Sequence, residues 1–295
     1  QLRLQLEALP PDETELLICR RLGVAALPPE VATLIHEKAH GNPFFSEELA
    51  YALRDAGLIQ IAGGVCALTP GADLRALSFP ETVQAAIISR IDRLAPTQQL
   101  ALKVASVIGR VFAFRILHAV YPLEIGQAQL TDDLTTLAQL DITPQDALAA
   151  DPSYSFKHAI TQDVVYNLML FSQRRQLHRA VAEWYERAYT DEPWLYPLLA
   201  YHWSKAEVAE RALEYLEKAG LHALGIYALR EARTMFSQAA DLLGQTKAAQ
   251  SGALAQRGAR LMLLLFVTHR PLGSFPFPRA SLHHCLSRAE AAGDR

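Results

Sequence analysis

The segment from Gly41 to Leu49, which reads Gly-Asn-Pro-Phe-Phe-Ser-Glu-Glu-Leu, constrains the local fold more than any other part of the sequence. Apolar residues at helical spacing predict a helix from Pro29 to His40, and Gly41 follows it as the residue best able to adopt the left-handed conformation that ends a helix. Pro43 suits the first position of a second helix, running to Ala56, because the amide that proline lacks has no partner there. We expect a rigid helix-loop-helix corner, and a buried stripe on the second helix made of Phe44, Phe45, Leu49 and Leu53.

The flanking segments also predict mostly helix. A helix from Asp12 to Leu22 precedes the corner, and two short strands on either side of Gly63-Gly64 form a typical two-residue hairpin. Three further helices are expected. The first runs from Pro80 to Leu94, the second carries Leu100 to Val107 and ends at Gly109, and the third starts near Phe112 and continues through Leu130 to Leu140. A strand at Tyr154–Phe156 follows them. Three helices and a strand in this order favour a winged-helix subdomain.

A repeated pattern marks the last third of the chain. Ala212, Leu216 and Ala219 have the same spacing as Ala232, Phe236 and Ala239. Small, large and small residues at these offsets let two helices approach closely, as the helix pairs of tetratricopeptide (TPR) solenoids do. Ordinary helical core packing is the alternative for any single position, and the repetition favours the solenoid.

Composition narrows the function classes. The 295 residues suit two or three small domains, and the net charge of −3 provides no general attraction to nucleic acid or to anionic membranes. The apolar run from Leu261 to Val267 is too short to span a bilayer. Three scattered cysteines, Cys19, Cys66 and Cys285, lack metal or redox spacing and fit free thiols in a reducing compartment. We therefore expect a cytoplasmic protein with no membrane contact.

Five sequence blocks together resemble one family. The chain is similar to the STAND class of AAA-type regulatory ATPases, especially those fused to bacterial class III adenylate or guanylate cyclases and to TPR arrays. The blocks that carry the resemblance are Gly41–Leu49, Leu77–Ala85, Arg90–Leu94, Ala105–Phe112 and Phe156–Ala159. The similarity weakens after about Gly244.

The resemblance implies a mainly α fold with three parts: a helical lid with a small hairpin at 1–78, a winged-helix subdomain at 79–171, and TPR-like helical repeats at 172–295. The nucleotide-binding core of such an ATPase is expected upstream, since the chain begins at Gln1 and contains no G-x-x-x-x-G-K-[ST] phosphate loop. The ending at Arg295, where a solenoid needs another helix to cover its apolar face, is expected to be a truncation.

The resemblance also implies a nucleotide clamp. Gly41, Asn42 and Pro43 would belong to the nucleotide site, where the Gly41 to Phe44 corner places Pro43 against adenine. His158 would contact the β-phosphate of ADP and hold a closed state. An imidazole suits this role because it can donate to phosphate oxygens. The alternative is that His158 is a partly exposed residue at a helix start. The complete protein would use ATP or ADP with Mg²⁺, whereas this chain alone should neither hydrolyse ATP nor bind it tightly.

The sequence His36-Glu37-Lys38-Ala39-His40 matches the H-E-x-x-H pattern of zinc hydrolases. The expected helix stops at Gly41 directly after the second histidine, and no third ligand follows at a suitable spacing. We expect no metal here and no catalytic residues in the chain. Two solvent-facing histidines near a helix C-terminus, where positive charge is favourable, are the simpler interpretation.

The leading hypothesis is a regulatory and protein-interaction fragment of a signalling ATPase, whose TPR-like region binds a protein partner and whose effector is a domain such as a nucleotide cyclase. One rival is a transcription regulator that reads DNA through the winged helix. Against it, the segment Gln127–Gln139 has Asp132 and Asp133 but no Lys or Arg to contact bases. A second rival is a helical scaffold with no nucleotide role, and the third and weakest is the H-E-x-x-H hydrolase.

Overall fold

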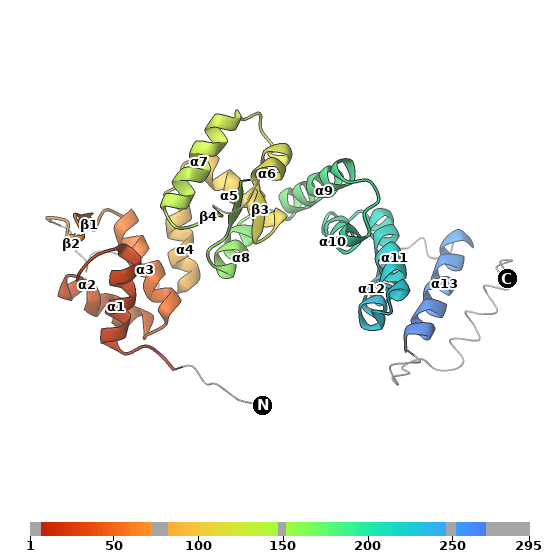
Figure 1. Ribbon diagram of the computed structural model, residues 1–295, viewed down its shortest axis with the longest axis horizontal. Helices are drawn as coiled ribbons and strands as arrows, with labels where there is room; N and C mark the ends of the chain where they lie inside the picture. Colours follow the sequence, from red (N-terminus) through yellow and green to blue (C-terminus); the bar gives the residue numbers. More distant parts are fainter. Residues whose placement is uncertain (1–6, 72–81, 147–151, 246–251, 270–295) are drawn as a thin grey trace. The chain divides into compact units, whose positions relative to one another are not determined.

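The structure, a computed structural model, describes residues 7–71, 82–146, 152–245 and 252–269. The chain divides into two compact units, one comprising Gln1–Phe114 with Leu123–Leu168 and the other Arg115–Pro122 with Met169–Arg295. Helices account for most of the described residues, so the prediction of a mainly α chain is confirmed (Figure 1). The finer assignment of a lid, a winged helix and a solenoid stays a prediction.

The first unit begins with three helices and a hairpin. They are α1 (Pro11–Leu22), α2 (Pro29–Ala39), α3 (Pro43–Asp55), β1 (Ile59–Ala62) and β2 (Val65–Leu68). The two strands pair antiparallel with Ala62 opposite Val65, and Gly63 and Gly64 both have positive φ, as a two-residue turn of this kind requires. The predicted hairpin is therefore confirmed. Cys19 and Cys66 are free and buried here, and burial raises the pKa of both thiols.

The corner forms where the sequence predicts it, with one change. The helix α2 ends at Ala39, so that both His40 (φ 50°) and Gly41 (φ 70°) adopt the left-handed conformation. The side chain of Asn42 accepts a hydrogen bond from the amide of Phe45 at 3.1 Å and caps α3, and Pro43 occupies the first helical position. The amide of Leu9 donates to the carbonyl of Gly41 at 2.8 Å, and a Cβ on Gly41 would lie 2.4 Å from the Leu9 carbonyl oxygen.

The helix α3 is the centre of this region. It packs against α1, α2, β1 and α4 (Val83–Asp92), and every residue from Phe45 to Leu53 is buried. Phe44 is the exception to the predicted stripe, because it is only half-buried and its ring packs on the imidazole of His158. A helix buried on all sides must also bury its polar residues, and two of these are Glu47 and Glu48.

The remaining elements of the first unit are α5 (Pro96–Ile108), β3 (Val111–Ala113), α7 (Gln127–Gln139), β4 (Gln145–Asp146), β5 (Ser153–Ser155) and α8 (Ala159–Asn167). The strands form an antiparallel sheet in the order β3-β5-β4. A helix does start near Phe112, since α6 (Phe114–Val120) begins two residues later, but Phe112 itself lies in β3 opposite Tyr154. The predicted continuation of that helix to Leu140 is wrong, because Leu130 belongs to the separate helix α7, and Leu140 directly follows α7. Thr82 caps α4 three residues before Ala85, and Pro80 lies outside the described residues.

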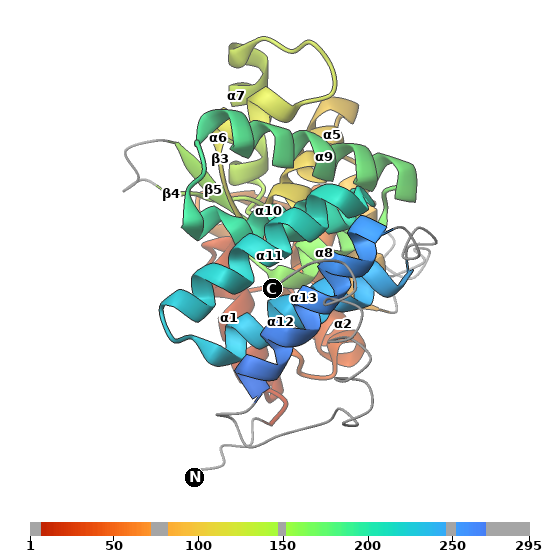
Figure 2. The same ribbon diagram turned by 90° about the vertical axis from the view of Figure 1, so that its right-hand side faces the viewer.

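The second unit contains α6 (Phe114–Val120, all but its first residue), α9 (Phe171–Ala188), a short 3₁₀ helix (Pro193–Leu195), α10 (Tyr196–Lys205), α11 (Ala209–Gly225), α12 (Leu229–Gln245) and α13 (Gly252–His269). From α9 onward, consecutive helices pack on one another (Figure 2). The six residues of the predicted repeat are all buried in one core. A Cβ on Gly220 of α11 would lie 2.4 Å from the ring of Phe236, so α11 and α12 approach closely at a small residue.

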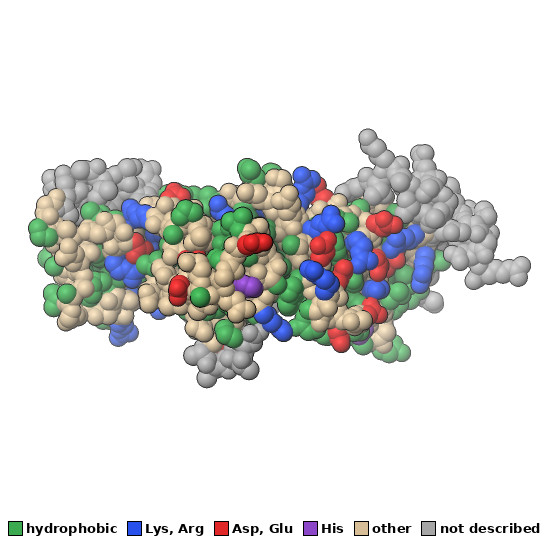
Figure 3. Space-filling model, turned by 90° about the horizontal axis from the view of Figure 1, so that it is seen from above, with side chains coloured by type: hydrophobic (Ala, Val, Ile, Leu, Met, Phe, Trp, Pro, Cys, Tyr) green, Lys and Arg blue, Asp and Glu red, His purple; other side chains and the backbone are tan. Residues whose placement is uncertain are grey.

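Charged side chains of both signs are interspersed on the face drawn in Figure 3, without a continuous patch of either sign. Within the described residues, no helix combines the length and the apolar character needed to cross a membrane.

Candidate functional site

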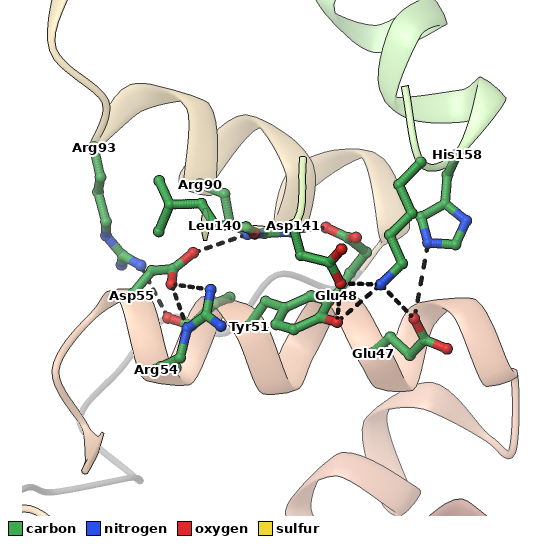
Figure 4. Close-up of polar contacts among 12 residues, drawn as sticks. Glu47, Glu48, Tyr51, Arg54, Asp55, Arg90, Arg93, Leu140, Asp141 and His158 are labelled. Atoms are coloured by element: carbon green, nitrogen blue, oxygen red, sulfur yellow. Dashed lines mark hydrogen bonds and ion pairs between the residues drawn. The ribbon is translucent and has the colours of Figure 1, made fainter. Parts of the chain in front are cut away.

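The carboxylate of Glu47 lies among three basic side chains of the first unit, those of Arg21, Lys157 and His158. Glu47 is 4% exposed, and its Oε1 accepts a hydrogen bond from Nε of Arg21 on α1 at 2.9 Å. Its Oε2 lies 3.4 Å from Nζ of Lys157 and 3.8 Å from Nε2 of His158, residues that directly precede α8 (Figure 4). Burial alone would raise the pKa of Glu47, but His158, Lys157 and Arg21 outweigh it and lower this pKa to about 2.

The ammonium group of Lys157 is held in place by two further contacts. It donates to the hydroxyl of Tyr51 at 2.9 Å and to Oδ2 of Asp141. Tyr51 donates to the same carboxylate oxygen at 2.6 Å. Burial lowers the pKa of Lys157, but hydrogen bonds to Asp141 and Tyr51 outweigh it and raise it, so the amine stays charged. Asp141 follows α7 with φ of 60°, a conformation that aspartate tolerates better than most residues.

A second buried cluster forms around Arg90 of α4, which is 5% exposed. Its guanidinium donates to Glu48 at 2.9 Å, to Asp55 at 3.0 Å and to the carbonyl of Leu140 at 2.8 Å. It also lies over the ring of Tyr51, with 4.7 Å between the central carbon and the ring centroid. Because Leu140 and Asp141 follow α7, these two clusters join the end of α7 to α3 (Figure 4).

The structure brings the predicted site residues close to one another. The rings of Phe44 and His158 lie 4.2 Å apart, so His158 is next to the first turn of α3, which Asn42 and Pro43 begin. Asn42 and Pro43 are exposed, whereas Gly41 is buried against Leu9. The side chain of His158 is 26% exposed, and its Nε2 is buried without a hydrogen-bond partner in the structure.

Sequence reasoning missed the partners of His158. Glu47, Tyr51 and Asp55 recur every four residues along α3, a spacing that places them on one face of the helix. This polar row on a helix rich in apolar residues was the available signal. Nothing in the spacing indicates that Arg21 and Lys157, from distant segments, complete the cluster.

The two histidines of the H-E-x-x-H pattern do not both lie on the helix. His36 lies on α2, but His40 follows the end of that helix with φ of 50°, so the two imidazoles do not project from consecutive turns. The described part of the chain contains no group of three or more side chains suited to holding a metal ion.

Comparison with known proteins gives two findings. Residues 10–67 match the family model of a domain of unknown function (DUF8739), a span from α1 into β2 that includes Glu47 and Tyr51. The chain is also 26% identical over 246 residues to the uncharacterized protein R02095 of Rhizobium meliloti (strain 1021). That similarity covers 82% of this chain and 23% of the relative. The chain thus spans about a quarter of the length of the relative that it matches.

Proposed function

We propose that this chain is the regulatory and protein-interaction part of a longer signalling ATPase of the STAND class. In this proposal the first unit closes on a nucleotide held by an upstream core, and the second unit contacts a protein partner. The effector would be a further domain of the same protein, such as a nucleotide cyclase. The motif resemblance supports the class, and the relative, of which the chain covers 23%, supports a longer protein.

The observation that carries the proposal is the position of His158 beside the Gly41–Pro43 corner. The ring of Phe44 packs on the imidazole at 4.2 Å and connects two segments that are far apart in the sequence. An exposed proline ring and a partly exposed imidazole therefore lie close together in the first unit. Pro43 would contact adenine, and His158 would donate to the β-phosphate.

His158 has the chemistry needed to contact the phosphate of ADP. His158 Nε2 is buried without a hydrogen-bond partner, and a phosphate oxygen is a strong acceptor for an imidazole N–H. One imidazole and one proline are not a complete nucleotide site. The amide cradle, the lysine and the hydroxyl that hold the phosphates and Mg²⁺ would come from the upstream core. This chain alone would bind ATP or ADP weakly and catalyse nothing.

The second unit supports a role in protein binding. A groove of about 480 Å³ lies between α10, α11 and α12, and its lining combines apolar and uncharged polar side chains with one carboxylate. Residues of this groove include Pro197, Tyr201, Ser204, Met235, Gln238 and Asp241. Such a mixed surface suits a protein segment better than DNA, whose phosphates require cationic contacts. We place the protein in the cytoplasm, where ATP and reduced thiols are available.

The experiment that tests the proposal compares two substitutions in the full-length protein by calorimetric titration of ADP and ATP. His158→Ala should weaken ADP binding by roughly ten- to a hundredfold, the loss of one charge-assisted hydrogen bond, and ATP binding less. Pro43→Ala should weaken both nucleotides alike. The exposed His222 on α11 provides the control, since His222→Ala, in the second unit, should change neither affinity. Unchanged ADP affinity in His158→Ala would refute the clamp.

A further inference from the structure

The two oxygens of the Glu47 carboxylate are held very differently. Oε1 accepts a hydrogen bond from Arg21 at 2.9 Å. Oε2 is buried and has no hydrogen-bond partner, although Lys157 lies at 3.4 Å and His158 at 3.8 Å. Oε2 is therefore held by charge at a distance rather than by hydrogen bonds. A buried charged oxygen without hydrogen bonds is costly, so this contact can be replaced by an anion that bonds better.

The two nitrogen groups around Oε2, those of Lys157 and His158, are held by contacts other than those with Glu47. Tyr51 and Asp141 hold the ammonium group of Lys157, and the ring of Phe44 packs on His158. If the carboxylate moved away, both groups would remain in place with unused donors. Such a preorganised pair of donors favours an oxyanion with more oxygens than a carboxylate, such as a phosphate.

We propose that Glu47 is an internal competitor for the phosphate group, occupying Lys157 and His158 until a phosphate oxyanion displaces it. This inference rests on the proposed function for its physiological ligand, because the phosphate would be that of the nucleotide. It adds a regulatory step to that function. Each closure of the first unit would require Glu47 to exchange partners, and an isolated chain would not bind phosphate at this cluster while Glu47 occupies it.

The test measures binding of inorganic pyrophosphate to this chain by calorimetry. Glu47→Gln keeps the shape of the side chain and an acceptor for Arg21 but removes the competing charge. We expect its affinity for pyrophosphate to be at least about tenfold higher than that of the unsubstituted chain. Glu37→Gln, an exposed position on α2, makes the same change in net charge and should leave the affinity unchanged. Adding Lys157→Met to Glu47→Gln should abolish the gain.

Two results would overturn the inference: equal pyrophosphate affinity in Glu47→Gln and the unsubstituted chain, or an equal gain in Glu37→Gln. Far-UV circular dichroism would establish that each variant is folded. If Glu47→Gln does not fold, Glu47→Asp replaces it, since the shorter side chain draws the carboxylate away from Lys157 and His158. That variant should also gain affinity, and its failure to do so would equally overturn the inference.

The outcome separates this inference from the proposed function. A gain in Glu47→Gln together with unchanged ADP binding in full-length His158→Ala supports the competitor and refutes the nucleotide clamp. The opposite result is that Glu47→Gln gains no pyrophosphate affinity while His158→Ala weakens ADP binding. That result retains the nucleotide clamp and refutes the role of Glu47 as a competitor.

Discussion

Replacing Arg90 by methionine should destabilise the first unit severely. The guanidinium is 5% exposed and donates to two carboxylates and to one backbone carbonyl. Methionine keeps much of the side-chain volume but leaves Glu48, which is 3% exposed, buried without its cation. Asp55 is affected less, because Arg54 also pairs with it at 2.9 Å. Removing one partner of a buried ion pair costs about 3 to 5 kcal/mol, a large part of the roughly 5 to 15 kcal/mol that stabilises a typical domain.

The distribution of tryptophan makes the assay specific to one unit. The three tryptophans, Trp184, Trp194 and Trp203, all lie in the second unit. Urea titrations followed by tryptophan fluorescence therefore report on that unit, whereas far-UV circular dichroism reports on the helices of both. We expect Arg90→Met to move the circular dichroism transition to lower urea and to leave the fluorescence midpoint unchanged.

Two further variants separate the charge effect from loss of packing. Arg93→Met removes an exposed arginine that donates to the carbonyl of Ala52 at 3.0 Å, and it should cost only about 1 kcal/mol. Glu48→Gln added to Arg90→Met should recover part of the lost stability, because a neutral amide is buried at lower cost than a carboxylate. A cost below about 1 kcal/mol for Arg90→Met, or no recovery in the double variant, would refute the account of this cluster.

Two other predictions concern the corner and the second unit. Gly41→Ala should cost at least about 2 kcal/mol in urea unfolding and Gly57→Ala about 1 kcal/mol. Both glycines have φ of 70°, but only the Cβ at Gly41 meets backbone, so equal costs would show that Leu9 does not restrain the corner. Burial lowers the pKa of His178 to about 3 and that of His202 to about 4, from an ordinary 6.5. As pH falls from 6.5 to about 4, these imidazoles therefore bind protons in the unfolded chain but not in the folded chain. The free energy of unfolding should fall by about 1.4 kcal/mol per pH unit for each imidazole. Fluorescence-detected unfolding at pH 7 and pH 5 measures this, and equal stabilities would contradict it.

The elements that could be predicted are those determined by local chemistry. Three features of the corner depend only on the neighbouring backbone: the proline at the start of α3, the capping residue before it, and the left-handed residues at the end of α2. The Gly63-Gly64 turn is likewise a local signal. These features were found with errors of one or two residues, such as the end of α2 at Ala39 instead of His40.

The strands β3 and β4 could not be predicted, because their pairing with β5 defines them. β3 has three residues and β4 has two, too few for a visible alternation of apolar and polar side chains. Both pair with β5, from which they are separated in the sequence. Phe112 itself was expected in a helix because of its apolar neighbours, but it pairs with Tyr154 in β3, and the helix α6 begins two residues later at Phe114.

The two buried clusters on α3 use charge in two different ways on one helix. Around Arg90, three N–H groups, one from each guanidinium nitrogen, have acceptors at 2.8 to 3.0 Å. Glu47, directly before Glu48, faces Lys157 and His158 without a hydrogen bond from either to its Oε2, although it is equally buried. Well-packed apolar groups often stabilise a fold at least as well as a buried ion pair, so stability alone does not account for these buried carboxylates. The hydrogen bonds of Arg90 fix α3 to the end of α7. Under the proposed competition, the Glu47 cluster leaves one carboxylate oxygen available for exchange, beside His158 and the first turn of α3.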